Sequence, residues 1–370
     1  MRPIRSIAAA LAIGVTAGVA GVAAGPTPGG FTSDNVEWVT YIPFDIGSAT
    51  GMTIRGDMAF VTSWRAVSVY DITDRRNPQL LNTTPFGFRF ENEDVAGNDE
   101  ILIFSETLPQ GTLHIYDITN PQLGVPLTEI ATIEGAGDHT SECILNCEYV
   151  YGSEGTMTYV GQTAENAVDA KLLDTNWMEL MGTGVFSNHD VEVFNDEGYF
   201  VTTPISQDFH VVDATDPLNP VVLGRGQHPD PSSWLYHSGD WFRGGQDKFT
   251  LMQGEQNAQP QCGEGNGPIV LHEAENKLFD PETNLLFPGV REEAIAVNKR
   301  VAAGSESAAA DYPYQSTIRD VYAVGNGTYQ DGSPAVNGLG CSAHWFQEQP
   351  DWKDGGLVAV GYYEHGTRFL

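Results

Sequence analysis

The chain of 370 residues is poor in basic side chains. Its 18 Lys and Arg stand against 49 Asp and Glu, which gives a formal net charge of −31. This balance repels phosphate backbones and anionic lipid surfaces, so we expect neither nucleic acid nor a membrane surface as a partner. The acidic residues are scattered rather than run together, which favours a role in solubility over a general attraction for cations.

The sequence also lacks the short motifs of several enzyme classes. It has no GxSxG nucleophile elbow, no HExxH pair, no P-loop and no dinucleotide-binding glycine fingerprint. The stretch YGSEG (151–155) carries its serine in the wrong frame for a nucleophile elbow. Nucleophilic hydrolysis and phosphoryl transfer therefore have no support in the sequence.

Long apolar runs are absent after residue 24. Before it, Arg2 and Arg5 precede a small-residue apolar stretch that ends at Ala24 and is followed by a Pro/Gly-rich break. This order is typical of a secretory signal peptide. A membrane anchor is the alternative, but no stop-transfer charges follow the stretch. We expect residues 1–24 to be removed, 25–35 to be flexible, and the mature protein to be secreted, soluble and monomeric.

Cysteine is scarce as well, with four residues in all. An even count in an exported chain favours disulfides, and three pairings are open. Cys143–Cys147 closes a tight hairpin and leaves Cys262–Cys341 as a longer link. A zinc site built from cysteines is the rival, but the sequence has no CxxC pair.

What the sequence does contain is an internal repeat. Three segments align on sight: AVSVYDITDRRNPQLL (66–81), TLHIYDITNPQLGVPLTEI (112–130) and DFHVVDATDPLNPVVL (208–223). Each has an alternating strand ending in Asp, a Pro-containing turn and a second short strand. Two further strands precede each copy, and weaker copies follow the same order, so the repeating unit has four strands.

The spacing of these units predicts the fold. The second strands begin at residues 58, 101, 149, 199, 249 and 357, so successive starts lie 43, 48, 50, 50 and 108 residues apart. Units of this length with four strands are typical of a β-propeller. We predict one all-β domain over 36–370 with six blades, closed by an N-terminal strand at 37–44. An insertion at 278–335, a helix or a mobile loop, interrupts the fifth unit. A seventh blade beyond the C-terminus is the alternative.

At this point the chain resembles the LVIVD-repeat family of exported, propeller-like proteins. The strands LHIYDITNP and FHVVDATDP carry the resemblance, together with GCSAHWF and GGLVAVGYYEHGTRFL near the C-terminus. It covers roughly residues 45–370. The degenerate copy MTYVGQTAEN and the long insertion depart from the repeat. The resemblance implies the fold and the export, and no general biochemical activity.

Histidines recur at one place in the repeat. His189 and His139 each lie 10 residues before the second strand of their unit, while His237 and His344 lie 12 and 13 residues before theirs. Glu91 takes this place in the second unit. Because the first strands of a propeller line its channel, these side chains should converge on the axis. We predict a single transition metal ion there, Fe, Cu or Zn, with His139, His189, His237 and His344 as ligands.

Glutamates form a second register near the ends of the second strands. Antiparallel pairing returns these ends to the start of the first strands, where a carboxylate can accept the second N–H of a metal-bound imidazole. The candidates for this outer role are Glu91, Glu106, Glu154, Glu255 and Glu364. Without a metal, a ring of histidines would simply satisfy backbone groups around a water-filled channel.

Aromatic residues cluster beside the histidines. Trp241 and Trp345 either pack between blades or wall a substrate pocket over the metal, and Arg368 is placed to reach the channel mouth. Two hypotheses follow. The first is an exported metalloprotein with redox or oxygen chemistry on a small molecule. The second is a non-enzymatic binding or scaffold propeller that recognises a protein or small ligand on its loop face. A hydrolase with Glu91 or Glu93 as its base is a weaker third.

Overall fold

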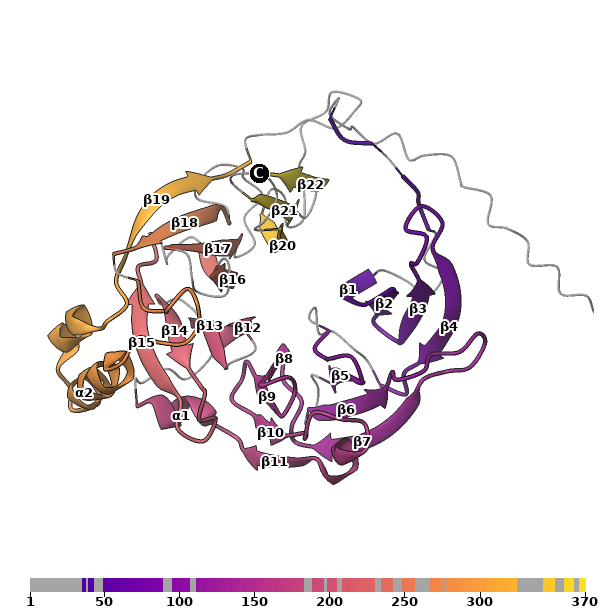
Figure 1. The fold of residues 1–370 in the computed structure, drawn as a ribbon, viewed down its shortest axis with the longest axis horizontal. Coiled ribbons are helices and arrows are strands. Elements are labelled where there is room, and N and C mark those ends of the chain that lie inside the picture. The colour runs from indigo at the N-terminus through magenta and orange to yellow at the C-terminus, as the bar shows by residue number, and fades with distance from the viewer. Residues whose placement is uncertain are drawn as a thin grey trace, which may run out of the picture.

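The structure is a computed structural model, and it places the blades of a β-propeller around one axis (Figure 1). Its six antiparallel sheets follow one another along the chain, and two short α-helices are the only α-helices in the described part. The described residues are 35–37, 39–42, 49–88, 95–106, 111–182, 188–195, 198–204, 208–229, 234–241, 248–256, 267–275, 277–324, 342–349, 356–362 and 366–370.

Each blade runs from an inner strand outward to the rim. The inner strands are β1 (Ala49–Arg55), β8 (Ser141–Ile144), β12 (Asn188–Asn195), β16 (Trp234–Trp241) and β20 (Ala343–Gln349). The second strands are β2 (Met58–Ser63), β5 (Ile101–Glu106), β9 (Tyr149–Gly152), β13 (Tyr199–Pro204), β17 (Phe249–Gln256) and β21 (Leu357–Tyr362). The third strands are β3 (Ala66–Asp71), β6 (Thr112–Asp117), β10 (Met157–Tyr159), β14 (Phe209–Asp213), β18 (Ile269–Ala274) and β22 (Gly366–Phe369). The rim strands are β4 (Gln79–Pro85), β7 (Thr128–Glu134), β11 (Lys171–Asp174), β15 (Val221–Gly226) and β19 (Ser316–Tyr322).

The prediction of six blades is confirmed, and all six second strands begin at the predicted residues. The second blade has three named strands, because its inner segment meets β5 through the single bridge Gly97–Leu102. Local alternation recurs from unit to unit, and both alternation and turn residues act within one hairpin, so the hairpins are specified independently of one another. The starts of the strands could therefore be predicted from the sequence to the residue.

The Asp that ends the repeated motif has a defined role in the turn. In three blades its carboxylate accepts the backbone N–H of the Thr two residues later: Asp71 with Thr73 at 2.9 Å, Asp117 with Thr119 at 2.8 Å and Asp213 with Thr215 at 2.9 Å. Such Asx turns end a strand and leave the chain free to reverse. The repeated DIT and DAT stretches are therefore turn signals.

Apolar cores fill the spaces between neighbouring blades. Blades 1 to 6 are joined by five such cores, for example the one in which Ile144 and Tyr151 of blade 3 pack against Phe200 and Val212 of blade 4. The far face of blade 1 differs, since Ala59, Tyr70 and Ile72 form a small cluster with residues of their own blade. Each seam holds two blades together because it removes apolar surface from water.

The N-terminal segment lies along blade 1. Glu37 forms an exposed ion pair with Arg76 at 3.3 Å, and Ile42 lines an apolar groove of about 470 Å³ with Met52 and Tyr70. The described residues of 37–44 are not in a strand, and the sheet of blade 6 consists of β20, β21 and β22 in the described part. Closure of the ring through 37–44 thus stays a prediction.

The range predicted as an insertion contains part of blade 5. Its β19 pairs with β18, so the interruption between these two strands is shorter than 278–335. It holds the helix α2 (Val290–Ala302) and the 3-10 helix η3 (Glu306–Asp311). Helix α2 packs on β15 of the preceding blade, where Asn298 donates to the carbonyl oxygen of Val222 at 3.0 Å.

The chain after α2 lies directly against β15. The amide of Tyr314 donates to the carbonyl oxygen of Leu223 at 3.0 Å, and a Cβ on Gly224 would stand 2.2 Å from the carbonyl oxygen of Tyr314. Glycine is required at 224 because any larger residue would push the two backbones apart. The insertion is therefore a packed element that joins the rims of blades 4 and 5.

Two short helices accompany blade 3, η1 (Asn166–Asp169) and α1 (Trp177–Met181). Trp177 of α1 is fully buried, stacks on Tyr151 at 4.8 Å and donates its indole N–H to the carbonyl oxygen of Gly152 at 2.8 Å. Among the described residues, none of the helices has the length and apolar character that a membrane crossing requires.

The disulfide Cys143–Cys147 is present as predicted. It closes the turn between β8 and β9, in which Leu145, Asn146 and Cys147 all have positive φ angles of 53°, 53° and 62°. Left-handed backbone is costly for residues other than glycine, and the covalent link offsets part of that cost. The pair Cys262–Cys341 lies outside the described residues.

Candidate metal centre

The four histidines predicted from the repeat lie next to one another in space. The ring centroids of His139 and His189 are 5.0 Å apart, those of His189 and His237 are 4.2 Å apart, and those of His237 and His344 are 4.3 Å apart. Each ring comes from a different blade, in the order of blades 3, 4, 5 and 6. His139 and His344, which are more than 200 positions apart in the chain, thus belong to one group because the blades are arranged around a common axis.

Irregular strand pairing accompanies three of these histidines. The register between the first and second strands shifts beside His189, between Asn188 and Val191, and beside His237, between Tyr236 and Ser238. It shifts again beside His344, between Ala343 and Trp345. A β-bulge turns a side chain away from the direction that regular alternation would give it. The repeated bulge therefore turns successive imidazoles toward the same point.

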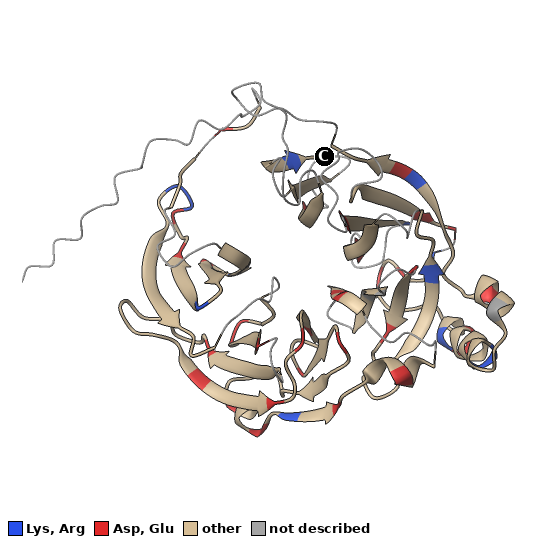
Figure 2. Cartoon of the chain, turned by 180° about the vertical axis from the view of Figure 1, so that it is seen from behind, with Lys and Arg blue, Asp and Glu red and all other residues tan. Residues whose placement is uncertain are grey.

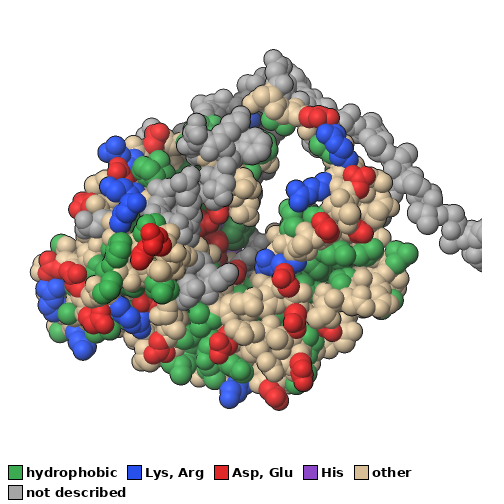
Figure 3. Space-filling view, viewed as in Figure 1, with side chains coloured by type: hydrophobic (Ala, Val, Ile, Leu, Met, Phe, Trp, Pro, Cys, Tyr) green, Lys and Arg blue, Asp and Glu red, His purple; other side chains and the backbone are tan. Residues whose placement is uncertain are grey.

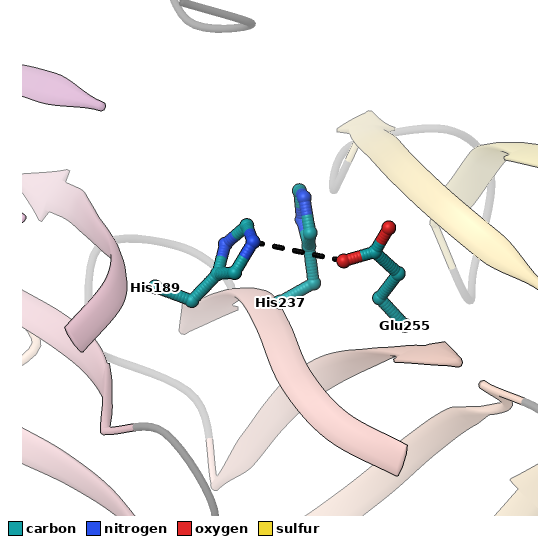
Figure 4. A group of neighbouring side chains, drawn as sticks. All are labelled: His189, His237 and Glu255. Atoms are coloured by element: carbon teal, nitrogen blue, oxygen red, sulfur yellow. Dashed lines mark ion pairs between the residues drawn. The ribbon is translucent and has the colours of Figure 1, made fainter. Parts of the chain in front are cut away.

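Glu255, at the end of β17, lies among the rings (Figure 4). Its Oε2 is 3.6 Å from Nε2 of His189, and its Oε1 is 3.9 Å from Nε2 of His344. One ligand atom each from His189, His237 and Glu255 lie within 4.8 Å of one another. The sequence predicted an outer role for this carboxylate, whereas the structure places it level with the imidazoles.

Hydroxyl groups hold the backbone of the two central histidines. Thr203 donates to the carbonyl oxygen of His237 at 3.0 Å, and its Oγ1 accepts the amide N–H of Asp190 at 2.8 Å. Thr140 donates to the carbonyl oxygen of His189 at 3.1 Å. The bonds to the carbonyl oxygens of His237 and His189 each join one blade to the next, so buried threonines help to set the separation of the ligand-bearing strands.

The carboxyl group of Asp138 fixes the segment that carries His139. It accepts the amide N–H groups of Glu154 and Thr156 at 3.1 and 3.0 Å, and the hydroxyl of Thr156 at 2.9 Å. Burial raises its pKa to about 6, against the opposing effect of the hydrogen bonds from Thr156. Asp138 thus ties the start of the inner strand to the end of β9.

The other predicted outer glutamates have different surroundings. The side chain of Glu154 is exposed. Glu106 lies 3.8 Å from Nε2 of His114, whose Nδ1 is 2.6 Å from Glu129, so it belongs to a polar cluster of blade 2. Glu91 and Glu364 lie outside the described residues, as does Glu93. Of the three candidates that the structure describes, Glu255 is the one that lies among the histidines.

Of the three residues predicted to line a pocket, Trp345 lines an axial cavity, whereas Trp241 and Arg368 lie elsewhere. Trp345 lies with its ring 5.2 Å from that of His237 and lines an axial cavity of about 770 Å³. Trp241 is buried in the core between blades 4 and 5, with its ring 5.6 Å from Phe194 and 5.3 Å from Phe279. Neighbours on a strand point to opposite faces, and here Asp240 takes the cavity side. Arg368 is exposed on β22 and does not line this cavity.

One group of functional candidates was missed by the sequence reading. Carboxylates from the inner strands of four blades line the axial cavity: Glu142, Glu192, Asp240 and Glu348. Each follows a candidate ligand by three or four residues, in HTSE, HDVE, HSGD and HWFQE. This regular spacing could have been recognised in the sequence. At about 3.3 Å per residue, it corresponds to a separation of about 10 Å along the strand.

The charges of the cavity wall are therefore mostly negative. Arg55, on β1 of blade 1, is the single basic residue among the described residues that line it. Figure 3 shows the opening at the centre of the described part of the molecule, with acidic side chains at its wall. The other acidic residues are spread over the blades, as Figure 2 shows and as the sequence predicted.

The arrangement can bind a first-row transition metal ion. Imidazole nitrogens and a carboxylate oxygen are ligands for Fe and Zn, and two histidines with one carboxylate leave coordination positions open. The donors come from two neighbouring blades, His189 from blade 4 and His237 and Glu255 from blade 5. His139 and His344 lie at either end of the histidine group. The residues thus fit the predicted metal, with Glu255 added to the ligand set.

No family model matches the chain, and no curated protein is similar to it. A chain in the crystal structure of the mitotic checkpoint complex is 10% identical, with a TM-score of 0.48 over 87% of this chain and 76% of that one. The β-propeller domain of Cps50 (Swd1) from Myceliophteria thermophila is 8% identical, with a TM-score of 0.47 over 88% of this chain and 87% of that one.

Proposed function

We propose that this chain is a metal-binding propeller that holds one transition metal ion on its axis. The observation that carries the proposal is the convergence of His189 from blade 4 with His237 and Glu255 from blade 5 (Figure 4). His237 is fully buried, and the side chains of His189 and Glu255 are 14% and 18% exposed. Donor atoms so sheltered from water bind a cation more strongly than exposed ones, since competing hydration is weaker.

The ligand set bears on the kind of chemistry. A set of two histidines and one carboxylate with open positions is typical of Fe(II) oxygenases, and the same residue types hold catalytic zinc. A bound iron or copper ion would supply redox or oxygen chemistry at the axis. This chain's own residues would hold the metal, wall the cavity with Trp345 and bring carboxyl groups within reach of a small ligand.

Metal content is the direct test. Protein purified without a tag and reconstituted in turn with Fe(II), Cu(II) or Zn(II) is expected to retain about one equivalent of one metal by elemental analysis. His189→Ala and Glu255→Gln should lose it, while the exposed Glu154→Gln is the matched control and should keep it. A folded wild-type chain that retains less than about a tenth of an equivalent of every metal rejects the proposal.

The end members of the histidine group need a separate comparison. If His139 and His344 only flank the site, His139→Ala and His344→Ala will retain the metal with reduced affinity. If the ion takes four imidazoles, both variants will lose it as completely as His189→Ala. Anomalous diffraction at the metal edge identifies the element and its ligands in the same crystal.

Export and membership of the LVIVD-repeat family are the remaining parts of the proposal. They rest on the N-terminal sequence and on the repeated strand motifs. Expression of the full chain with its own N-terminus, followed by mass spectrometry of the mature protein, is expected to show cleavage near Ala24. A chain that keeps residues 1–24 in the cytoplasm would contradict export.

A further inference from the structure

The space between blades 6 and 1 differs from the other five seams of the ring. Apolar cores join blades 1 to 6 in succession, but among the described residues no such core joins blade 6 to blade 1. The axial cavity of about 770 Å³ extends into this seam, since it is lined by Val61 of blade 1 and by Ala359 and Thr367 of blade 6. A cavity thus takes the place that a packed core takes in the other seams.

The apolar groove on blade 1 continues from this cavity. The groove, of about 470 Å³, and the cavity share Ala49, Met52 and Val61 in their walls. From there the groove crosses β1, β2 and β3, a distance of about 10 Å, and ends at the turn before β4, where Arg75 lies. Met52 and Ile54 in its wall are 61% and 51% exposed. Large apolar side chains gathered on one exposed wall indicate a surface that binds something.

The two ends of this continuous space carry opposite charges. Carboxyl groups of four inner strands line the inner end and face one guanidinium, that of Arg55, whereas the exposed Arg75 lies at the outer end. Burial raises the pKa of Asp240, yet the three remaining carboxylates still outnumber the guanidinium. A cation is therefore attracted to the inner end and repelled from the outer end. The four acidic residues are Glu142, Glu192, Asp240 and Glu348.

We propose that the axial cavity and the groove together bind an amphipathic cation, a small molecule with an ammonium group and an apolar chain. The ammonium group lies among the carboxyl groups and the ring of Trp345, and the chain lies along Met52 and Ile54. Both volumes are in the range of small-molecule sites. Because the ring of Trp345 is 5.2 Å from that of His237, the bound cation would lie beside the proposed metal. Its use as a substrate rests on the proposed function, whereas its binding does not.

Calorimetric titration of the full, metal-free chain with octyltrimethylammonium, below its micelle concentration, tests the binding. This quaternary ion has no lone pair, so it cannot act as a metal ligand. We expect it to bind at least 10-fold more tightly than octanol, and octyl sulfate not to bind. Decyltrimethylammonium should bind about 10-fold more tightly than the octyl ion, because two further CH2 groups are buried in the groove.

Two matched pairs of variants separate the charged end from the apolar wall. Glu192→Gln should weaken binding of the octyl cation about 10-fold and leave octanol unchanged, whereas Glu134→Gln, at an exposed carboxyl group of the rim strand β7, should alter neither. Ile54→Gln should weaken both ligands about 5-fold. Leu80→Gln, at an equally exposed apolar residue of β4 outside the groove, should weaken neither. Glu348→Gln replaces Glu192→Gln if that variant does not fold.

Several outcomes overturn the proposal. They are octanol binding as tightly as the cation, equal losses in Glu192→Gln and Glu134→Gln, and no binding of the cation at millimolar concentration. A second copy of the chain on the groove would appear in sedimentation as a dimer that Ile54→Gln dissociates, and this result would also overturn it. Since the titration uses the metal-free chain, its failure is distinguishable from failure of the metal-content test.

Discussion

Replacing His272 tests how burial of a neutral histidine links stability to pH. His272 lies on β18 with no exposed surface, and its Nε2 is 2.8 Å from the hydroxyl of Tyr236, the residue before His237. Burial, and secondarily the charge of His228, lowers its pKa from 6.5 to about 4. The folded protein therefore keeps this imidazole neutral in mildly acidic solution, where the unfolded chain protonates it.

The sign and size of the effect follow from this difference. Above pH 6.5 both states are neutral, and the histidine makes no difference to stability. Below it, the unfolded state binds one more proton, so the free energy of unfolding falls by about 1.4 kcal/mol for each pH unit. The loss ends near pH 4, the folded pKa, and amounts to about 3 kcal/mol in total.

Urea unfolding followed by tryptophan fluorescence measures this loss, since urea is uncharged and leaves the electrostatics unscreened. His272→Gln keeps hydrogen-bonding capacity but cannot be protonated. Titration of all other groups is common to both proteins, so the stability of the wild type relative to the variant should fall by about 3 kcal/mol between pH 7 and pH 4. A stability difference that does not change with pH would refute the reasoning.

The matched control removes the hydrogen bond and leaves the burial. Tyr236→Phe deletes the hydroxyl, while the imidazole of His272 remains enclosed by Phe209 and its other neighbours. Because burial is the main cause of the lowered pKa, this variant should keep the pH dependence of the wild type. If Tyr236→Phe removes it instead, the hydrogen bond and not desolvation is the cause.

Two further predictions concern the threonine that joins blades 4 and 5 and the turn of blade 3. Thr203→Val removes the hydroxyl between Asp190 and His237 and should weaken metal binding by about 10- to 100-fold in a competition titration. Thr84→Val, which removes a comparable bond to Leu127 between blades 1 and 2, should leave it unchanged, and equal losses in both would contradict a positioning role. Replacing both Cys143 and Cys147 by Ser should lower the free energy of unfolding by about 2 kcal/mol, the value for so short a loop, as urea unfolding will show. No change in stability would mean that hydrogen bonds alone hold the left-handed turn.

The sequence was informative wherever the unit repeats. Strand starts at Met58, Tyr149 and Leu357 follow from alternation and turn residues, which act within one hairpin. The convergence of His139 with His344 follows from copies of one hairpin arranged about one axis. Both inferences needed only the period of the repeat and the geometry of a propeller.

Structural features that depart from the repeat could not be predicted from the sequence in the same way. The bulges beside His189 and His237 leave no mark in the composition, so the position of Glu255 at the level of the imidazoles could not be predicted from the sequence. The assignment of β19 to blade 5 was hidden by the helices before it. The spacing of Asp240 and Glu348 from the histidines could be recognised in the sequence, but their place in one cavity depends on how two blades face each other.

The insertion between β18 and β19 has a mechanical consequence. It crosses from blade 5 to blade 4 at the rim, through Asn298 and Tyr314, while Thr203 spans the same two blades near the axis. Because blades 4 and 5 are joined both near the axis and at the rim, they cannot rotate apart about a single contact. We therefore expect blades 4 and 5 to keep a fixed relative position, which would hold the backbones of His189 and His237 at a constant separation.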